Sequence, residues 1–189
     1  MVMPQSVTRW TAEMVRALPD DGKRYEVVDG VLLVTPAPRD LHQRAVIAVI
    51  VTLDPYVRSH RVGEVLTAPA DIELDPEAMV QPDVFVQGFV EGRLSQGWNT
   101  GAPLWLVVEV LSPSTARADR TTKRRRYQRA GIPEYWIVDP DARTVERWRP
   151  GDERPEVLSE SITWSPAPGS EPLTIDLAAL FARIHGEAG

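Results

Sequence analysis

The sequence predicts an α/β fold in which a mixed central sheet is flanked by helices. From residue 41 onward the patterns run helix, three or four strands, helix, strand. The last helical pattern separates two strongly apolar strands, and such a crossover makes the two strands parallel neighbours. The earlier strands have short connections, which favour antiparallel pairs. Together these observations predict a sheet with both kinds of pairing.

The length favours a single domain. A chain of 189 residues is shorter than the roughly 250 residues beyond which proteins divide into separate cores. Its composition, 43% hydrophobic and 25% charged, is typical of a globular protein. We expect one domain over residues 1–189, with a core at about 8–150 and a C-terminal extension at 151–189.

A short helix and a hairpin are expected first. Thr11 begins a short helical pattern over residues 11–18. Residues 25–36 contain two strand patterns joined by Asp29-Gly30. Asp-Gly between apolar strands is a strong hairpin signal, because both turn positions need positive φ.

A longer helix and a series of strands follow. Asp40 is the expected N-cap of this helix, with Gln43 at the capping-box position, and the helix should end near His60. Strand patterns then cover residues 64–68, 71–74, 83–87 and 104–111. The last of these is apolar on both faces apart from Glu109, which is typical of a central strand covered on both sides.

The remaining elements complete the predicted sheet. A helix is expected over residues 119–130, closed by Gly131. Strand patterns follow at 134–139 and 144–149. Beyond residue 150 we expect a pair of extended strands and a short helix with Asp176 as its N-cap.

Composition excludes several kinds of site. The chain has no cysteine, which excludes disulfides, thiolate nucleophiles and Cys-containing zinc sites, and fits a reducing compartment. The first residues lack the basic flank and apolar run of a signal peptide. The longest apolar stretch, residues 46–51, is far below the roughly 18 residues that span a bilayer. We therefore expect a cytoplasmic protein that does not act at a membrane.

Positive charge is concentrated in one segment of an acidic chain. The formal net charge is −6, yet residues 117–129 hold seven Arg or Lys and one Asp. This window therefore carries +6 and the rest of the chain −12. Such an asymmetry indicates either an anion-binding patch or a solvated helix face.

Carboxylates are the remaining candidates for chemistry. The sequence contains no GxxxxGK[ST], GxGxxG, GxSxG or HExxH motif. Its three histidines, His42, His60 and His185, are scattered, so a triad hydrolase or a histidine-rich zinc site lacks its residues.

Glu109 and Asp83 are the most informative acids. The strand period places Glu109 on the same face as Trp105, Val107 and Leu111, where an ionised carboxylate is costly unless it is paired or bound to a metal. A buried ion pair with Lys123 or with an arginine of the following helix is the simpler interpretation. For Asp83, which opens an apolar strand, a turn-capping role after Pro82 is the simpler interpretation.

Together the two acids indicate more than either does alone. Asp83 and Glu109 lie on two strands of one sheet, and Lys123 lies on the helix that follows the second. Two carboxylates and an ammonium could hold a hard divalent cation and hydrolyse a phosphodiester. The alternative for Lys123 is an i,i+4 ion pair with Asp119, which contributes a few tenths of a kcal/mol.

A family resemblance rests on five features that occur in one order. They are YEVVDG, QPDVFV, VVEVLSPST, the set Asp119, Lys123 and Tyr127, and GIPEYWIVDP. Together they resemble the Uma-two family of restriction-endonuclease-like proteins, which belongs to the PD-(D/E)XK nuclease superfamily. The resemblance covers roughly residues 8–150. It implies a restriction-endonuclease-like core of order αβββαβ, which agrees with the order of the patterns.

The resemblance also implies roles for individual residues. Pro82-Asp83 matches the PD half of the motif, Glu109 matches the second acid, and the Val110 carbonyl is an expected additional metal ligand. The superfamily pattern has Lys two residues after the second acid, but this chain has Leu111 there. Lys123, on the next helix, is the candidate replacement.

Further positions match the family less specifically. Glu26, on the first hairpin, resembles a third acidic metal ligand. His42-Gln43 and Tyr127 are candidate accessory residues, although a capping box alone would explain Gln43 and core packing would explain Tyr127. Candidate nucleic-acid contacts are Arg117, Arg120, Arg124 and Arg125, although helical geometry prevents all the arginines of this segment from facing one groove.

These features predict an endonuclease that depends on Mg²⁺ or Mn²⁺ and hydrolyses nucleic acid, with DNA as the expected substrate. The alternative is a catalytically inactive protein of nuclease fold that binds nucleic acid or a protein, because the usual lysine position holds Leu111. A hydrolase for a smaller phosphoester is a third interpretation. A homodimer would suit a double-strand cut, since two strands need two sites.

Overall fold

A six-stranded mixed sheet forms the centre of the protein. The computed structural model describes residues 9–94, 97, 101–166 and 169–187. The strand order is β10-β9-β8-β7-β6-β3, and only β7 and β8 are parallel. The strands are β3 (Gly63–Thr67), β6 (Val84–Gly88), β7 (Leu104–Val110), β8 (Tyr135–Asp139), β9 (Thr144–Trp148) and β10 (Glu156–Leu158).

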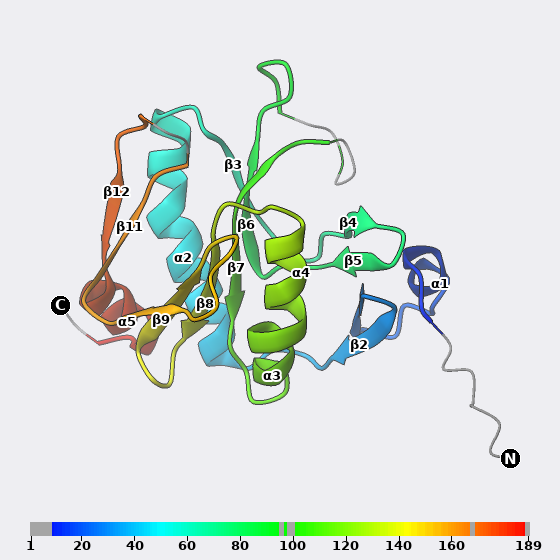
Figure 1. Cartoon of the computed structure of the whole chain (residues 1–189). Coiled ribbons are helices and arrows are strands. Elements are labelled where there is room, and N and C mark those ends of the chain that lie inside the picture. Colours follow the sequence, from blue (N-terminus) through cyan, green and yellow to red (C-terminus); the bar gives the residue numbers. More distant parts are fainter. Residues whose placement is uncertain (1–8, 95–96, 98–100, 167–168, 188–189) are drawn as a thin grey trace, which may run out of the picture.

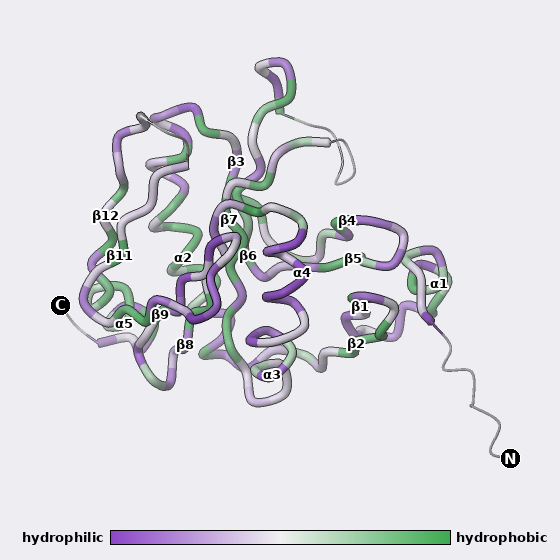
Figure 2. Tube along the Cα trace, viewed as in Figure 1, coloured by the Kyte–Doolittle hydropathy of each residue, from purple (hydrophilic) through white to green (hydrophobic). Residues whose placement is uncertain are grey.

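Two different layers cover the faces of this sheet (Figure 1). One face packs against α2 (Asp40–Ser59), α5 (Leu177–His185) and the pair β11 (Ser161–Trp164) and β12 (Leu173–Asp176). The other face packs against one continuous helix, made of α3 (Ala116–Ala118), η1 (Asp119–Lys123) and α4 (Arg124–Arg129). Figure 2 shows hydrophilic residues along α4, where the sequence concentrates its arginines.

A small four-stranded sheet lies beside the second layer. Its order is β2-β1-β5-β4, and all its pairs are antiparallel. The elements are α1 (Ala12–Arg16), β1 (Arg24–Val28), β2 (Val31–Thr35), β4 (Ile72–Asp75) and β5 (Ala78–Val80). In Figure 1 this sheet and α1 lie on the far side of α4 from α2 and α5. The strand β1 therefore approaches the central sheet on the face that carries α4.

The structure confirms the predicted core order. The helix α2, the strands β3, β6 and β7, the α4 helix and the strand β8 form the αβββαβ unit. The parallel pair follows the predicted crossover, and the first hairpin turns at Asp29 (φ 53°) and Gly30 (φ 77°) as expected. The hairpin of β4 and β5 is inserted between β3 and β6 and joins the small sheet instead of the central one. The strands β5 and β10 were not predicted.

The predicted capping box of the long helix is wrong. Arg39 is the N-cap and makes no side-chain capping hydrogen bond, while Asp40 is the first helical residue. The carboxylate of Asp40 instead lies 3.6 Å from Arg44 in an i,i+4 pair. The capping-box position, three residues after the N-cap Arg39, is His42, and Gln43 lies one position beyond it, so a capping box does not explain Gln43.

The helix after β7 and one face assignment also differ from prediction. The helix starts at Ala116, earlier than the predicted residue 119, and its second segment is a π-helix. In β7 the register against β6 shifts between Val86 and Gln87, so Trp105 packs with the α2 side while Val107 packs with the α4 side. Glu109 therefore shares a face with Val107 but not with Trp105.

No helix in the described ranges is long and apolar enough to cross a lipid bilayer.

Thr11, where the first helical pattern was predicted to begin, is the N-cap of α1, and the predicted N-cap Asp176 of α5 is confirmed. The side chain of Thr11 accepts from the amide of Met14, and that of Asp176 accepts from the amide of Ala179. The C-terminal elements share an apolar cluster with α2, through residues such as Trp164 and Phe181.

Candidate active site

A buried lysine joins three carboxylates. The Nζ of Lys123 lies 2.9 Å from Oε2 of Glu26 and 3.0 Å from Oε1 of Glu109. Asp119 is more distant, with Oδ1 at 3.7 Å from the same nitrogen. All four side chains are almost completely buried. The ammonium is therefore the positive charge that allows acids from β1, β7 and the π-helix to be buried together.

The strand period brings the two glutamates to one layer. Side chains two residues apart in a strand point to the same face, so Glu26 shares a face of β1 with Val28, and Glu109 shares a face of β7 with Val107. Val28 and Val107 belong to one apolar cluster. Both acids therefore enter the layer between the central sheet and the small sheet.

The π-helix supplies the lysine from the third side. It spans Asp119–Lys123, and both of its end residues are buried, as is Tyr127 one turn later. A π segment within an α-helix is a local irregularity that occurs frequently at functional sites. Here it coincides with the residues that approach the glutamates.

Two buried tyrosines hold this cluster. The hydroxyl of Tyr127 donates to Oε1 of Glu109 at 3.0 Å, the oxygen that also contacts Lys123. The hydroxyl of Tyr135 donates to the main-chain oxygen of Asp119 at 3.2 Å. Burial, followed by the charge of Glu109, raises the pKa of Tyr127 well above its usual value. Tyr127 therefore stays a hydrogen-bond donor and fixes the orientation of the Glu109 carboxylate.

Asp83 lies before β6 and has partners on both oxygens. Nη1 of Arg24 donates to Oδ1 at 2.7 Å. Nε2 of His42 lies 3.0 Å from Oδ2, and the amide of Val110 donates to Oδ2 at 2.9 Å. Burial alone would raise the pKa of Asp83, but the hydrogen bond from His42 and the charge of Arg24 outweigh burial and lower it. Asp83 is therefore ionised at neutral pH.

Glu109 responds in the opposite direction. Burial raises the pKa of Glu109 well above its usual value, against the opposing charge of Lys123. The surrounding carboxylates Asp83, Asp119 and Glu26 raise it further. By formal charge, the four buried acids outnumber the two buried or half-buried cations, Lys123 and Arg24.

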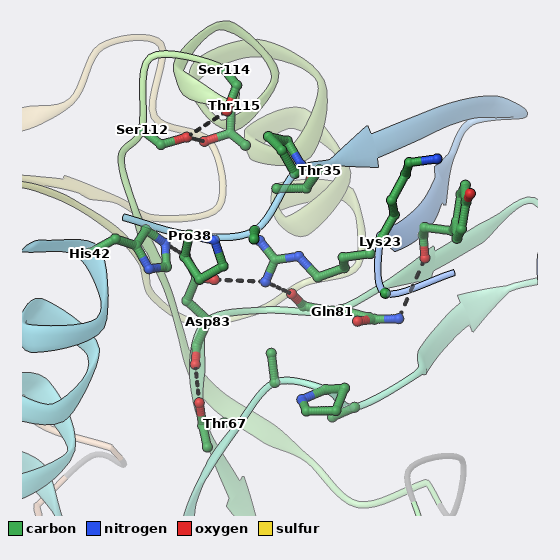
Figure 3. A pocket seen from close by; sticks show the side chains of 18 of the residues that line it. Lys23, Thr35, Pro38, His42, Thr67, Gln81, Asp83, Ser112, Ser114 and Thr115 are labelled. Carbon is green, nitrogen blue, oxygen red and sulfur yellow. Dashed lines mark hydrogen bonds and ion pairs between the residues drawn. The ribbon is translucent and has the colours of Figure 1, made fainter. Parts of the chain in front are cut away.

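An open cleft of about 1120 Å³ connects Asp83 to solvent. It lies between the small sheet, the first turns of α2 and the loop at residues 112–115, and its lining includes Arg24, His42 and Asp83. Figure 3 shows His42 and Asp83 turned toward one another, with Ser112, Ser114 and Thr115 on another wall. Glu109 and Lys123 do not line the cleft, so they lie deeper in the protein than Asp83.

The structure brings most of the predicted site residues together. Glu26, Glu109, Lys123 and Tyr127 are in direct contact. Asp83 joins them through the Val110 amide, which follows Glu109 in the chain. In a strand the amide and carbonyl of one residue point to the same side, so the Val110 carbonyl also faces the end of β6. Of the accessory residues, His42 contacts Asp83, and Gln43 lines the cleft.

The predicted arginine contacts are divided between structural and exposed positions. Arg120 pairs with Glu146 at 2.6 Å, and the guanidinium of Arg124 lies 4.7 Å from the centroid of the Trp148 ring. Arg117 and Arg125 are exposed and form no ion pair with the described residues. None of the four lines the cleft. Only Arg117 and Arg125 are therefore available to a ligand without breaking an internal contact.

Sequence reasoning missed Arg24. It stands two residues before Glu26, so the strand period places both side chains on the same face of β1. That spacing was the available signal, since a cation beside a predicted acid on the same face is a candidate for the same site. Asp119 was predicted as one of the residues that carry the family resemblance and as an alternative ion-pair partner of Lys123, and that pair is present.

The donor set suits a hard divalent cation, but two protein cations, Lys123 and Arg24, contact its carboxylates. Carboxylates and a main-chain carbonyl are the ligands that Mg²⁺ and Mn²⁺ prefer, and the excess negative charge favours a divalent ion. Among the described residues, however, no three Asp, Glu or His side chains are arranged to hold a metal ion. The oxygens of Glu26 and Glu109 meet at Lys123, and Oδ1 of Asp83 meets Arg24.

The fold and the buried acids define a nuclease-like α/β protein of the restriction-endonuclease type. The chain belongs to the Uma2 family, whose model, described as "Putative restriction endonuclease", matches residues 12–178. A crystal structure described as a putative nuclease of DUF820 from Anabaena variabilis is similar, with a TM-score of 0.73 and 21% identity over 93% of this chain and 99% of that chain. No curated protein matches the sequence.

Proposed function

We propose that this protein is a metal-dependent endonuclease that hydrolyses phosphodiester bonds of nucleic acid, with DNA as the substrate. The observation that supports the proposal most strongly is the convergence of Glu26, Glu109 and Lys123 behind Asp83, which lines an open cleft. Family membership and the nuclease-like fold support the same class of reaction.

Asp83 and Glu109 would hold Mg²⁺ or Mn²⁺, with Glu26 and the Val110 carbonyl as further ligands. Such an ion, when bound, lowers the pKa of a coordinated water and stabilises negative charge on the phosphate. The hydroxyl of Tyr127 donates a hydrogen bond to Oε1 of Glu109, and this bond fixes the orientation of the carboxylate. His42 and the Val110 amide do the same for Asp83.

Lys123 acts as a fixed positive charge. Burial would lower the pKa of Lys123, but the charges of Glu109, Glu26 and Asp119 raise it above its usual value. The side chain therefore stays protonated and cannot remove a proton from water. Its role is to hold the two glutamates and to strengthen the positive potential behind the reacting phosphate.

Cleavage assays with acid variants test the proposal. Wild-type protein should cleave plasmid DNA with Mg²⁺ or Mn²⁺ and should stop when EDTA is added. Asp83→Asn and Glu109→Gln should each lower the cleavage rate at least about 100-fold, because each replaces a negatively charged metal ligand with a neutral amide. Short single-stranded DNA and RNA substrates, tested in parallel, identify the preferred nucleic acid.

Glu146→Gln is the matched control. Glu146 is also a buried carboxylate of the central sheet, but it pairs with Arg120 outside the site. Its variant should cleave within about threefold of wild type. Equal cleavage by wild type and Asp83→Asn, or absence of cleavage of every substrate by wild type, would refute the nuclease proposal.

A non-cutting nucleic-acid-binding protein is the second candidate. One observation favours it: no three acids in the described chain are preorganised for a metal ion, and Leu111 at the usual lysine position is part of the apolar core. Calorimetry with Mn²⁺ separates the two candidates. Micromolar binding that is lost in Asp83→Asn supports the nuclease, whereas DNA binding without any metal binding supports the second candidate.

A further inference from the structure

Arg24 occupies the position from which a cation in the cleft would approach Asp83. Its Nη1 donates to Oδ1 of Asp83 at 2.7 Å and to the main-chain oxygen of Gln81 at 3.2 Å. The other oxygen of Asp83 is held by His42 and the Val110 amide. Among the described residues, Oδ1 is therefore the oxygen of Asp83 whose partner is a guanidinium that also lines the cleft.

Arg24 is surrounded by carboxylates. It shares a face of β1 with Glu26, and the negative charges of Asp83, Glu109 and Glu26 all act on it. These three acids are the carboxylate ligands of the proposed metal site. Arg24 also lines the cleft, and its side chain is 19% exposed while that of Asp83 is 4% exposed. It therefore lies between the acids and solvent.

We infer that Arg24 is the internal counter-ion of the metal-free site, and that a divalent cation binds by displacing its guanidinium from Oδ1 of Asp83. This inference rests on the proposed function, since it concerns the same metal site. It accounts for the absence of a preformed three-acid group in the described residues, because protein cations occupy the contacts that the metal would make.

Displacement lowers metal affinity in a predictable way. A guanidinium within about 4 to 6 Å of a carboxylate weakens the binding of a proton to that carboxylate by roughly one to three powers of ten. A divalent cation at the same carboxylate is repelled at least as strongly. Removing the guanidinium should therefore strengthen metal binding, even though it removes a hydrogen bond from Asp83. A residue with only a structural role would have the opposite effect, since its loss would disorder a metal ligand.

Calorimetric titration of the metal-free full chain with Mn²⁺ tests the inference. Arg24→Gln should bind Mn²⁺ at least about tenfold more tightly than wild type. Arg24→Lys should stay close to wild type, because the amine can still pair with Asp83. Arg39→Gln is the control for general charge, since Arg39 also lines the cleft but pairs with Asp141 instead of Asp83. It should change the affinity less than about twofold.

The outcomes separate this inference from the proposed function. If wild type binds Mn²⁺ and Arg24→Gln binds it equally or more weakly, the inference is wrong and the nuclease proposal stands. If Arg39→Gln strengthens binding as much as Arg24→Gln, the effect is general charge and the inference is also wrong. If neither wild type nor Arg24→Gln binds Mn²⁺, both the inference and the proposed function fail.

Discussion

Lys123 brings an amine to the two glutamates from the helix that follows β7. Leu111 shares the Glu109 face of β7 and packs in the apolar core, so the strand itself offers no amine. The amine comes from the π-helix and reaches Glu109 at 3.0 Å and Glu26 at 2.9 Å. The helix therefore supplies the positive charge that the strand lacks.

Lys123→Met should destabilise the fold strongly. The change leaves Glu26, Glu109 and Asp119 buried without their shared ammonium, and breaking such a buried pair costs about 3 to 5 kcal/mol. Urea denaturation measures the loss. Arg125→Met, an exposed position on the same helix, should stay within about 0.5 kcal/mol of wild type. Similar effects of the two substitutions would contradict the assigned role of Lys123.

Glu109→Gln should become more stable relative to wild type as the pH rises. The pKa of Glu109 is raised in the folded state, so its protonated form stabilises the fold below the unfolded pKa of about 4.3. That contribution is lost as the pH rises through the folded pKa, because Glu109 releases its proton at a lower pH in the unfolded chain than in the folded protein. Glutamine does not titrate and avoids this loss.

Urea denaturation in EDTA at pH values between about 5 and 8 measures this difference. The free energy of unfolding of Glu109→Gln minus that of wild type should increase across the range. A difference that falls with rising pH would mean that Lys123 stabilises the ionised carboxylate more than burial penalises it.

At the scale of elements, the helix after β7 contributes to the site on its buried side and connects the two sheets through its arginines. Its buried side carries Asp119, Lys123 and Tyr127 into the site. Its other arginines are mostly used within the protein, since Arg126 pairs with Asp75 at 2.5 Å and Arg129 pairs with Asp29. The charge run is therefore chiefly a connection between the central sheet and the small sheet.

The exposed remainder, Arg117 and Arg125, should account for the contribution of this helix to DNA binding. A double substitution to Gln should lower the slope of log affinity against log salt by about 2, since each phosphate contact on duplex DNA contributes about 0.9. Fluorescence anisotropy in EDTA measures the slope without cleavage. The same double change at Arg44 and Arg58, on the opposite face of the sheet, should leave it unchanged. An unchanged slope in both double variants would exclude this helix from the DNA interface.

At the scale of the whole molecule, the site forms where two sheets approach each other. Asp83 and Glu109 come from the central sheet, Arg24 and Glu26 from the small sheet, and Lys123 from the helix between them. The cleft follows the same boundary. The buried carboxylate of Asp83 at the edge of the cleft, with further buried charges behind it, is therefore a product of the assembly of layers and not of any one element.

Local patterns in the sequence predicted the elements but not their assembly. Asp29-Gly30 and Asp176 predicted their turn and cap because those signals act over a few residues. The meeting of Glu26 with Lys123 followed from family resemblance, because no local pattern specifies how β1 packs on the central sheet. The contact of Arg24 with Asp83 was missed for the same reason, since the two residues are 59 positions apart in the chain. The short strand β5 was missed although it forms a local hairpin with β4.

The most direct test of the account is the position of a metal ion in crystals soaked with Mn²⁺. The anomalous difference map should contain one strong peak within about 2.5 Å of carboxylate oxygens of both Asp83 and Glu109, with the Arg24 guanidinium moved away from Oδ1. A map without a peak at these acids at millimolar Mn²⁺, or a peak that contacts neither of them, would contradict the proposed metal-dependent nuclease site.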